Sequence, residues 1–383
     1  MTVTARSVLT RRALARLLLG WGTVVAMLLL RPLLAPPVQA GILVLALAAI
    51  IGVILVCAFG VVREAEHLAH RLGDPYGSLV LTISIVLIEV ILIAAVMMGP
   101  GDTPTIARDS VMAVSMIILN LVIGLSLLVG GLKHGGMTHN RTGTSAYFSM
   151  LVVLCSLAFA LPAVIGDGGT YTPGQAVPIV VLTIGLYVFF LWQQMGRHAG
   201  DFREVLPPAP RPDLEEVVAD AERPSVVAIF HEHRPEILTR VMLLVVTVLP
   251  IVLLSQDMAV LLDDGLGRLG APVALAGVLI AMIVFLPESI TSVRAALGGE
   301  IQRVSNLCHG ALVSTVGITI PVTLSIGFFT DRTVVLAESP TNLLMLGATL
   351  LLTVATFGGK RVGAMHGAAH LVVFAIYGIT IFS

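Results

Sequence analysis

Two glutamates stand inside apolar stretches of the chain. Glu89 lies near the middle of GSLVLTISIVLIEVILIAAVMMG, residues 77–99, and Glu288 lies in the apolar stretch 271–299, within FLPESITSVRAALGG. An acidic residue at the centre of a membrane helix costs about 2.5–3.5 kcal/mol, so it normally faces a cavity, a partner or an ion pathway. The chemistry open to such carboxylates is the binding of a cation or of a proton.

Composition places these glutamates in a membrane protein. Of the 383 residues, 57% are hydrophobic and 12% are charged, whereas a soluble domain has about 25% charged residues. The mean hydropathy is +0.99. We therefore expect an all-α polytopic membrane protein in contact with the lipid bilayer. The net charge of -1 and the lack of a basic domain give no sign of a nucleic-acid partner. Three widely separated cysteines, Cys57, Cys155 and Cys308, form neither a disulfide framework nor a CxxC site.

Windows of about 20 residues predict about eleven transmembrane helices. The first falls within residues 1–36, and the others lie near residues 41–62, 77–99, 110–131, 147–166, 175–193, 238–256, 271–293, 305–329, 341–358 and 364–382. The arginine-rich start could also be a signal peptide cleaved after Ala40, but its apolar run is longer than the 7–15 residues typical of such peptides, which favours an uncleaved helix.

Lysine and arginine residues are concentrated in alternate loops. The richer set holds Arg6, Arg11, Arg12, Arg16, Arg63, Arg71, Lys133, Arg141, the interval from Arg197 to Arg240, Arg303, Lys360 and Arg361, and the other loops hold only Arg108, Arg268 and Arg332. Because cytoplasmic loops carry the excess of positive charge, we expect a cytoplasmic N-terminus and a C-terminus outside.

The two halves of the chain resemble each other around the glutamates. HLAHRLGDPYGSLVLTISIVLIEV aligns with VLLDDGLGRLGAPVALAGVLIAMIVFLPES, and in the next helix Asn120 corresponds to Ser314. About five spans separate equivalent positions, so the second copy enters the membrane from the opposite side. Inverted repeats of this kind typically share a substrate site near the midplane. The expected organisation is an N-terminal helix (1–36), a first five-helix repeat (37–193), a cytoplasmic acidic connector (194–236) and a second five-helix repeat (237–383).

Further oxygen-bearing side chains lie near the two glutamates. Ser78 and Thr82 share a helix face with Glu89, and Thr291 and Ser292 follow Glu288 by about one turn. Together with Asn120 and Ser314 they form a set of hard oxygen ligands, which suits Ca²⁺, Na⁺ or K⁺. The alternative is that each serine or threonine bonds to its own backbone. Pro287 and Pro321 can interrupt their helices and free carbonyls for a cation.

Two carboxylates that face each other in a low-dielectric cavity cannot both stay ionised without a cation. Protons and a cation then compete for the same oxygens, and this competition, together with alternating access, is sufficient for exchange. Ca²⁺ matches the charge of both glutamates, while Na⁺ leaves one protonated or unpaired.

Two other classes of function are open to comparison with exchange. A cation channel could use the same pair of glutamates. No motif of an intramembrane enzyme is present, and we expect no enzyme activity and no cofactor.

For the other titratable groups, the sequence supports several hypotheses. His309 could relay protons or be a core histidine, and His366 and His370 stand four residues apart without a carboxylate that would complete a metal site. We expect a solvated cytoplasmic face at Glu64, Glu66, His67 and His70. The alternative is that these side chains form an entrance for cations or protons. The connector acids Asp213, Glu215, Glu216 and Asp220 lack EF-hand spacing, which favours a solvated connector over a regulatory cation site.

Three motifs resemble the Ca²⁺:cation exchanger superfamily, and within it the ChaA-type Ca²⁺/H⁺ (Na⁺/H⁺) antiporters of bacteria. They are EHLAHRLGDPYGSLVLTISIVLIEVILIAAVM, RDSVMAVSMIILNLVIGLSLLVGG and LPESITSVRAALGGEIQRVSNLCHGALVSTVGITIP. The resemblance implies two inverted five-helix halves after an extra helix, an inner (plasma) membrane location, and exchange driven by the proton gradient. It also implies that Glu89 and Glu288 are essential, with Asn120 and Ser314 in support.

The motifs also depart from the better-known Ca²⁺/H⁺ branch of that superfamily. That branch has Gly-Asn-Ala-x-Glu before the first carboxylate and a glutamine at the position of Ser314, whereas this chain has VLIE and FLPE. The smaller number of oxygen ligands leaves Na⁺ and K⁺ open beside Ca²⁺. A homo-oligomer also stays open.

Overall fold

The structure, a computed structural model, describes residues 8–72, 83, 86–87, 89–91, 93–94, 97–98, 104–205 and 226–382. Within these residues, ten helices are long and apolar enough to cross a membrane. The expectation of an all-α polytopic membrane protein is thereby confirmed. The expected span 77–99 is described only in part, and all of its described residues are helical.

The helices of the first part of the chain match the predicted spans and extend beyond most of them. They are α2 (Arg11–Leu30), α3 (Ala40–Leu72), α5 (Ile106–Met116), η1 (Ile117–Val122), α6 (Ile123–His134), α7 (Arg141–Cys155), η2 (Ser156–Ala160), α8 (Leu161–Ile165), α9 (Pro173–Met195) and η3 (Ala199–Phe202). The second part contains α11 (Val226–Arg268), α12 (Val273–Gly298), α13 (Ile301–Thr330), α14 (Pro340–Gly358) and α15 (Ala364–Ile381).

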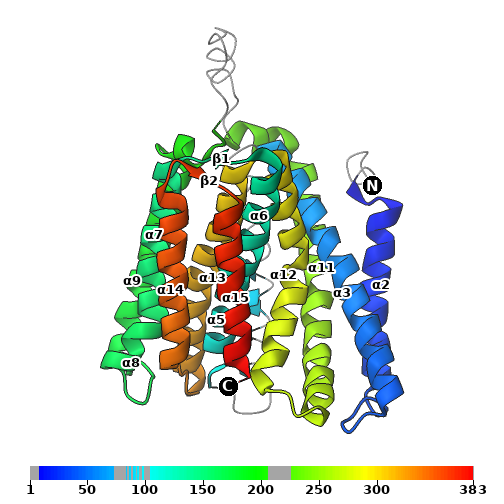
Figure 1. Ribbon diagram of the computed structural model, residues 1–383. Helices are drawn as coiled ribbons and strands as arrows, with labels where there is room; N and C mark the ends of the chain where they lie inside the picture. Colours follow the sequence, from blue (N-terminus) through cyan, green and yellow to red (C-terminus); the bar gives the residue numbers. More distant parts are fainter. Residues whose placement is uncertain are drawn as a thin grey trace.

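The transmembrane helices stand side by side in one bundle (Figure 1). Two short strands, β1 (Met137–Thr138) and β2 (Arg361–Val362), pair antiparallel at one end of the bundle, with Met137 opposite Val362. This end is called the ladder end below. The C-terminus lies at the opposite end, which is called the C-terminal end.

The segment α5–η1–α6 runs through the interior of the bundle. It forms one span, Ile106–His134, that is 83% buried in its most apolar window, more than any other described span. Its middle turn, η1, has π-helical hydrogen bonding and contains the fully buried Asn120. Single π turns occur frequently at functional sites because they turn a side chain out of the regular helical register.

Glycines allow α15 to approach α6 at backbone distance. A Cβ atom on Gly367 would lie within 3.0 Å of Leu128 N and Gly124 O, and one on Gly131 would lie within 3.0 Å of Ala364 N. Small residues at membrane helix interfaces permit this close approach, and packing then stabilises the pair. The contact holds α15 against η1 and therefore against Asn120.

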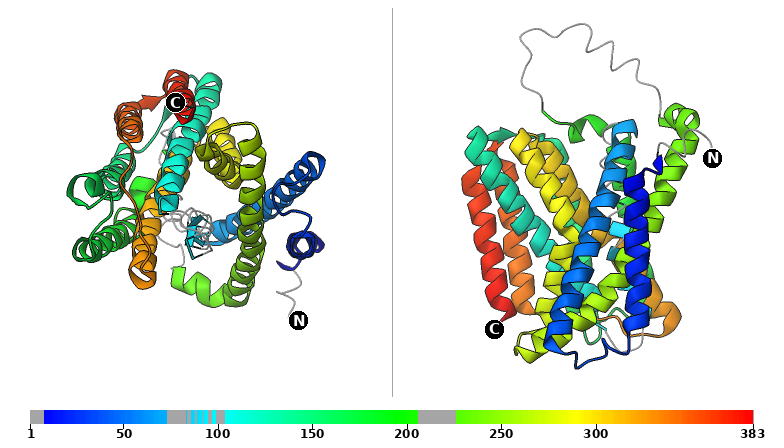
Figure 2. Two further views of the ribbon diagram at one scale, coloured as in Figure 1. Left: turned by 90° about the horizontal axis from the view of Figure 1, so that it is seen from below. Right: turned by 90° about the vertical axis from the view of Figure 1, so that its right-hand side faces the viewer.

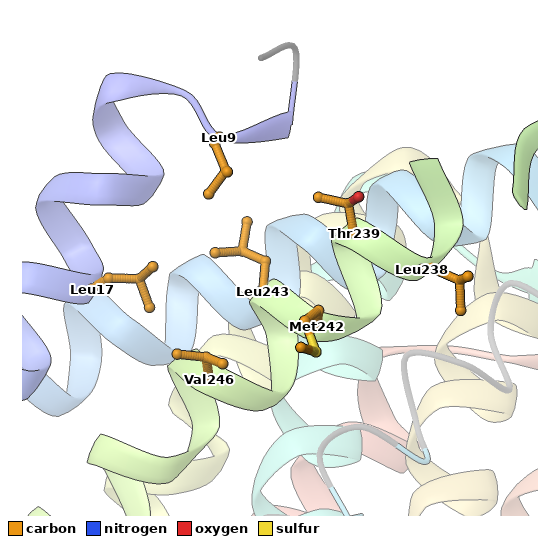
Figure 3. A pocket seen from close by; sticks show the side chains of 7 residues that line it. All are labelled: Leu9, Leu17, Leu238, Thr239, Met242, Leu243 and Val246. Atoms are coloured by element: carbon orange, nitrogen blue, oxygen red, sulfur yellow. The ribbon is translucent and has the colours of Figure 1, made fainter. Parts of the chain in front are cut away.

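Helix α2 lies at the edge of the bundle, beside α3 and α11 (Figure 2). Trp21 Nε1 donates a hydrogen bond to the Val246 carbonyl. An apolar groove of about 440 Å³ separates the start of α2 from α11 and is lined by Leu9, Leu17, Leu238, Thr239, Met242, Leu243 and Val246 (Figure 3). Because the groove carries one hydroxyl and no charge, it does not offer ligands for an ion.

The loop between α13 and α14, residues 331–339, is anchored across the C-terminal end. Val335 N donates to Pro104 O, Arg108 Nη1 donates to Ala337 O, and the buried Glu338 accepts hydrogen bonds from Ser339 N and Asn342 Nδ2. Burial raises the pKa of Glu338 above its ordinary value of 4.5, and the Asn342 hydrogen bond and the Arg108 charge oppose that shift.

The raised pKa of Glu338 predicts how stability changes with pH. The native state binds this proton more tightly than the unfolded chain, so the contribution of Glu338 to stability is complete below pH 4.5 and is lost as the pH rises through the raised pKa. The Tm of Glu338→Gln, which has no titrating group at this position, should therefore rise relative to that of wild type as the pH increases above 4.5. A Tm of Glu338→Gln that falls relative to wild type with rising pH would contradict this sign.

Candidate cation-binding site

Glu89 and Glu288 both lie inside the bundle. Each is only 5% exposed, and they are close enough for the charge of Glu89 to act on Glu288. Glu288 belongs to α12, and Glu89 belongs to the helical residues described between 83 and 98. The fold thus brings together the two acidic side chains that the sequence places in different halves.

The oxygens of this pair are largely without partners among the described residues. Thr315 Oγ1, on α13, donates a 2.7 Å hydrogen bond to Glu89 Oε2. Glu89 Oε1 and both oxygens of Glu288 have no hydrogen-bond partner within the described part of the chain. Buried polar atoms normally find a partner, so three open carboxylate oxygens are suited to a proton or a cation.

The residues after Glu288 bond mainly to helix backbone. Thr291 Oγ1 donates to the Pro287 carbonyl at 3.0 Å, which is the alternative in which the threonine bonds to the backbone of its own helix. Ser292 is fully buried, and its Oγ lies 3.6 Å from the Cys308 thiol that donates to it. Both α12 and α13 run on as single helices through Pro287 and Pro321. The interruption that these prolines could cause is therefore not seen.

Asn120 bonds to helices of the second half. Its Nδ2 donates to Thr349 Oγ1 at 2.9 Å, and its Oδ1 lies 3.2 Å from His370 Nδ1. His370 Nε2 in turn lies 3.1 Å from Thr356 Oγ1. No hydrogen bond joins Asn120 to either glutamate within the described residues. The packing of α12 and α13 against η1 nevertheless places Asn120 on an element next to the pair.

Ser314 makes a corresponding contact with the first half. Tyr187, on α9, donates a 3.0 Å hydrogen bond from its hydroxyl to Ser314 Oγ. In each case the polar residue on the helix after the glutamate contacts the last helix of the other half. It is Thr315, the next residue, that reaches Glu89.

The remaining candidates fall in three places. Ser78 and Thr82 lie outside the described residues. His309 is fully buried beside Phe148 and Phe357, with Nδ1 2.9 Å from Ser305 Oγ on its own helix and Nε2 without a hydrogen-bond partner among the described residues. His366 Nδ1 accepts a hydrogen bond from Gly363 N, and no group of three metal-binding side chains occurs in the part of the chain that was described.

A polar pocket lies at the ladder end of α12. It has a volume of about 220 Å³ and is lined by Glu66, Thr291, Arg294, Ala295, Glu300 and Arg303. Of the other residues expected near an entrance, Glu64 forms a 2.6 Å ion pair with Arg240 and His67 is exposed. The side chain of His70 and the connector acids Asp213, Glu215, Glu216 and Asp220 lie outside what the structure describes.

Thr315 is the site residue that sequence reasoning missed. The alignment of the halves paired Asn120 with Ser314, and a shift of one residue would have selected Thr315 instead. The signal was present in the adjacent hydroxyls of VSTVG, but only packing shows which of them reaches Glu89.

Removing the Thr315 hydroxyl should weaken cation binding. A hydrogen bond to a charged group contributes about 1.5–3 kcal/mol, and this one stabilises the ionised carboxylate that a cation needs. We expect Thr315→Val to raise the apparent KM for the cation by roughly tenfold or more, while Thr315→Ser stays close to wild type. Initial rates of cation-driven proton movement in proteoliposomes measure this. Equal KM values for the two variants would refute the assigned contact.

Comparison with known proteins places this arrangement in a family. The model of the family described as "Sodium/calcium exchanger protein" matches residues 42–196 and 240–382, which is most of the chain. The chain belongs to the sodium/calcium exchanger family. The exchanger is therefore a secondary transporter and not an enzyme, as the sequence predicted.

Two relatives of the exchanger are named as ion transporters. It is 33% identical over 344 residues to the sodium-potassium/proton antiporter ChaA of Escherichia coli (strain K12), covering 88% of each chain. It is also 34% identical over 329 residues to the putative ionic transporter y4hA of Sinorhizobium fredii (strain NBRC 101917 / NGR234), covering 85% of each. These similarities confirm the predicted membership of the Ca²⁺:cation exchanger superfamily and support a cation antiporter.

Solved structures share the fold at low sequence identity. The H⁺/Ca²⁺ exchanger CAX superimposes with a TM-score of 0.66 at 12% identity, covering 96% of this chain and 89% of that one. Native YfkE superimposes with a TM-score of 0.63 at 16% identity, covering 96% and 99%. At this identity the likeness establishes the fold of the exchanger.

Proposed function

We propose that the chain is a secondary active antiporter that exchanges a metal cation for protons at the Glu89–Glu288 pair. The observation that carries the proposal is the meeting of two buried carboxylates from different halves, with three of their four oxygens unbonded among the described residues. A buried charge is costly unless it is paired. Such a pair gains stability from either a proton or a cation.

The geometry gives each side chain a role in exchange. With protons bound, the two carboxyls are neutral and repel each other little. When a cation enters, the protons leave, the ionised oxygens coordinate the cation, and the Thr315 hydroxyl stabilises Glu89 through its hydrogen bond. Protons and cation compete for the same oxygens, so a site that opens alternately to each side carries one outward and the other inward.

Ca²⁺ export is the first form of this proposal, because a divalent ion balances two carboxylates. The second form is Na⁺ or K⁺ exchange for protons, favoured by the 33% identity to a protein named as a sodium-potassium/proton antiporter. In that form one glutamate keeps its proton while the other binds the monovalent cation. The two forms differ in how many protons leave when the cation binds.

We further propose an inverted two-repeat organisation in the inner membrane. The two ranges matched by the family model, 42–196 and 240–382, support the assignment of residues 37–193 and 237–383 as repeats, with 1–36 an added helix and 194–236 a connector. Lys133, Arg141, Lys360 and Arg361 gather at the ladder end. By the positive-inside rule this end is cytoplasmic, and the C-terminus is outside.

Transport in proteoliposomes tests the proposed function. The purified protein is reconstituted in vesicles that contain the pH dye pyranine, and Ca²⁺, Na⁺ or K⁺ is added outside. Antiport predicts that the internal pH rises when the cation is added outside. The rate of this rise should saturate with cation concentration, and the direction of flux should reverse when an opposing proton gradient is imposed. Flux that does not depend on protons would indicate a channel and would contradict the proposal.

A further inference from the structure

A row of buried hydroxyls continues along α13 from the carboxylate pair. Thr315, Thr319 and Thr323 stand four residues apart, and each is at most 1% exposed. Residues at this spacing form one ridge on a helix surface. The ridge continues through Gly327 to Asp331, and each step advances about 6 Å along the helix.

The three hydroxyls of this row differ in their hydrogen bonds. Thr315 Oγ1 donates to Glu89, and Thr323 Oγ1 donates to the Ile320 carbonyl on its own helix. Thr319 Oγ1 is buried and has no partner among the described residues. An unpaired buried hydroxyl is unfavourable, and a valine of nearly the same shape would avoid the cost. Thr319 therefore marks a place where a polar group serves something other than packing.

The row lies along the segment that carries Glu89. The two run in the same direction, because Thr315 contacts Glu89 at one end and Arg332 Nη1 donates a 2.6 Å hydrogen bond to the Met97 carbonyl at the other. Between these contacts, the described residues of the segment include the buried Ile93. The hydroxyls thus belong to the packed interior and do not face lipid.

A polar pocket opens where the row ends. It has a volume of about 310 Å³ at the C-terminal end, and its lining includes Leu324 and Gly327 of α13 and the exposed Asp331 and Arg332 that follow it. Tyr171, just before α9, and Ala176, on α9, also line the pocket. The ridge therefore leads from a carboxylate oxygen inside the bundle to a surface pocket that carries one acidic and one basic side chain, Asp331 and Arg332.

We propose that the α13 ridge is the path by which the transported cation and protons pass between Glu89 and the C-terminal end of the bundle. The hydroxyls of Thr315, Thr319 and Thr323 supply oxygens to a partly dehydrated cation or to water that carries a proton, and Asp331 offers a carboxylate at the mouth. The proposal rests on the proposed function, since it assigns a route to the same site.

Cysteine accessibility tests the path without relying on transport. In a background whose natural cysteines are replaced by alanine, Thr319→Cys and Thr323→Cys are treated with a membrane-impermeant methanethiosulfonate cation, added either to intact cells or to inside-out vesicles. We expect both to react from the C-terminal end at least about tenfold faster than Ile320→Cys, since access governs thiol reactivity. Ile320 is the matched control because it is equally buried on α13 but off the ridge.

A second readout separates a path from a structural hydroxyl. Thr319→Val should lower the rate of exchange several-fold while thermal stability is unchanged or higher, and Thr319→Ser should restore the rate. The path is wrong if Thr319→Cys and Thr323→Cys label no faster than Ile320→Cys, or if Thr319→Val exchanges at the wild-type rate. Failure of the proposed function is distinguishable, because Glu89→Gln and Glu288→Gln would then keep exchange whatever the labelling shows.

Discussion

Replacing Glu288 by glutamine should abolish exchange, with a loss of at least about 100-fold in rate, or ~2.8 kcal/mol. Glutamine keeps the size of the side chain and one oxygen, but it can neither release a proton nor balance a cation. Because Glu89 and Glu288 interact within one buried pair, we expect Glu89→Gln to have the same effect. Pyranine-loaded proteoliposomes measure both variants with Ca²⁺, Na⁺ and K⁺.

The matched control for this loss is Glu338→Gln. Glu338 is also 5% exposed, but it lies in the loop before α14, its Oε2 accepts hydrogen bonds from Ser339 N and Asn342 Nδ2, and its Oε1 lies 3.8 Å from Arg108 Nε. This variant should retain exchange. Near-normal exchange in Glu89→Gln or Glu288→Gln would show that the pair is not the shared site.

Gly367→Ala should destabilise the helix pair that holds Asn120. The added methyl group would meet Leu128 N and Gly124 O, which are backbone atoms and cannot turn aside as a side chain can. Overpacking costs about 1–3 kcal/mol, which for a chain of 383 residues corresponds to a loss of roughly 1–4 °C in Tm. The added methyl group would push α15 away from α6 and so lengthen the contact between His370 and Asn120. Thermal unfolding of the detergent-purified protein measures the loss.

Gly378→Ala provides the comparison on the same helix. A Cβ atom at Gly378 meets nothing within 4 Å, so this substitution should leave Tm unchanged or slightly higher, because alanine favours a helix. Equal stabilities for the two alanine variants would mean that the close packing of α15 on α6 is not needed to hold the bundle together.

Much of the fold follows from the sequence because membrane spans have a simple physical signature. Long apolar runs bounded by turn residues predicted each of the ten described helices of membrane-spanning length, and the cost of a buried charge singled out Glu89 and Glu288 before their proximity was known. The helices extend past the predicted ends, as with Ile106–His134 against 110–131, because polar residues beyond the apolar core continue the helix into the interface.

The finer contacts could not be predicted, because they depend on how helices rotate against one another. Neighbouring hydroxyls at Ser314 and Thr315 point to different faces of α13, so one bonds to Tyr187 and the other to Glu89. Asn120 was expected near the carboxylates, yet its hydrogen bonds run to Thr349 and His370 through a π turn that no sequence pattern announced.

Proton release on cation binding tests the central claim most directly. The detergent-purified protein is placed in weakly buffered solution with a pH dye, and Ca²⁺, Na⁺ or K⁺ is titrated in. The account predicts that binding releases protons in proportion to the bound cation, and that Glu89→Gln and Glu288→Gln release fewer or none. A cation that binds at full stoichiometry to wild type without releasing protons would contradict a pocket in which the two compete.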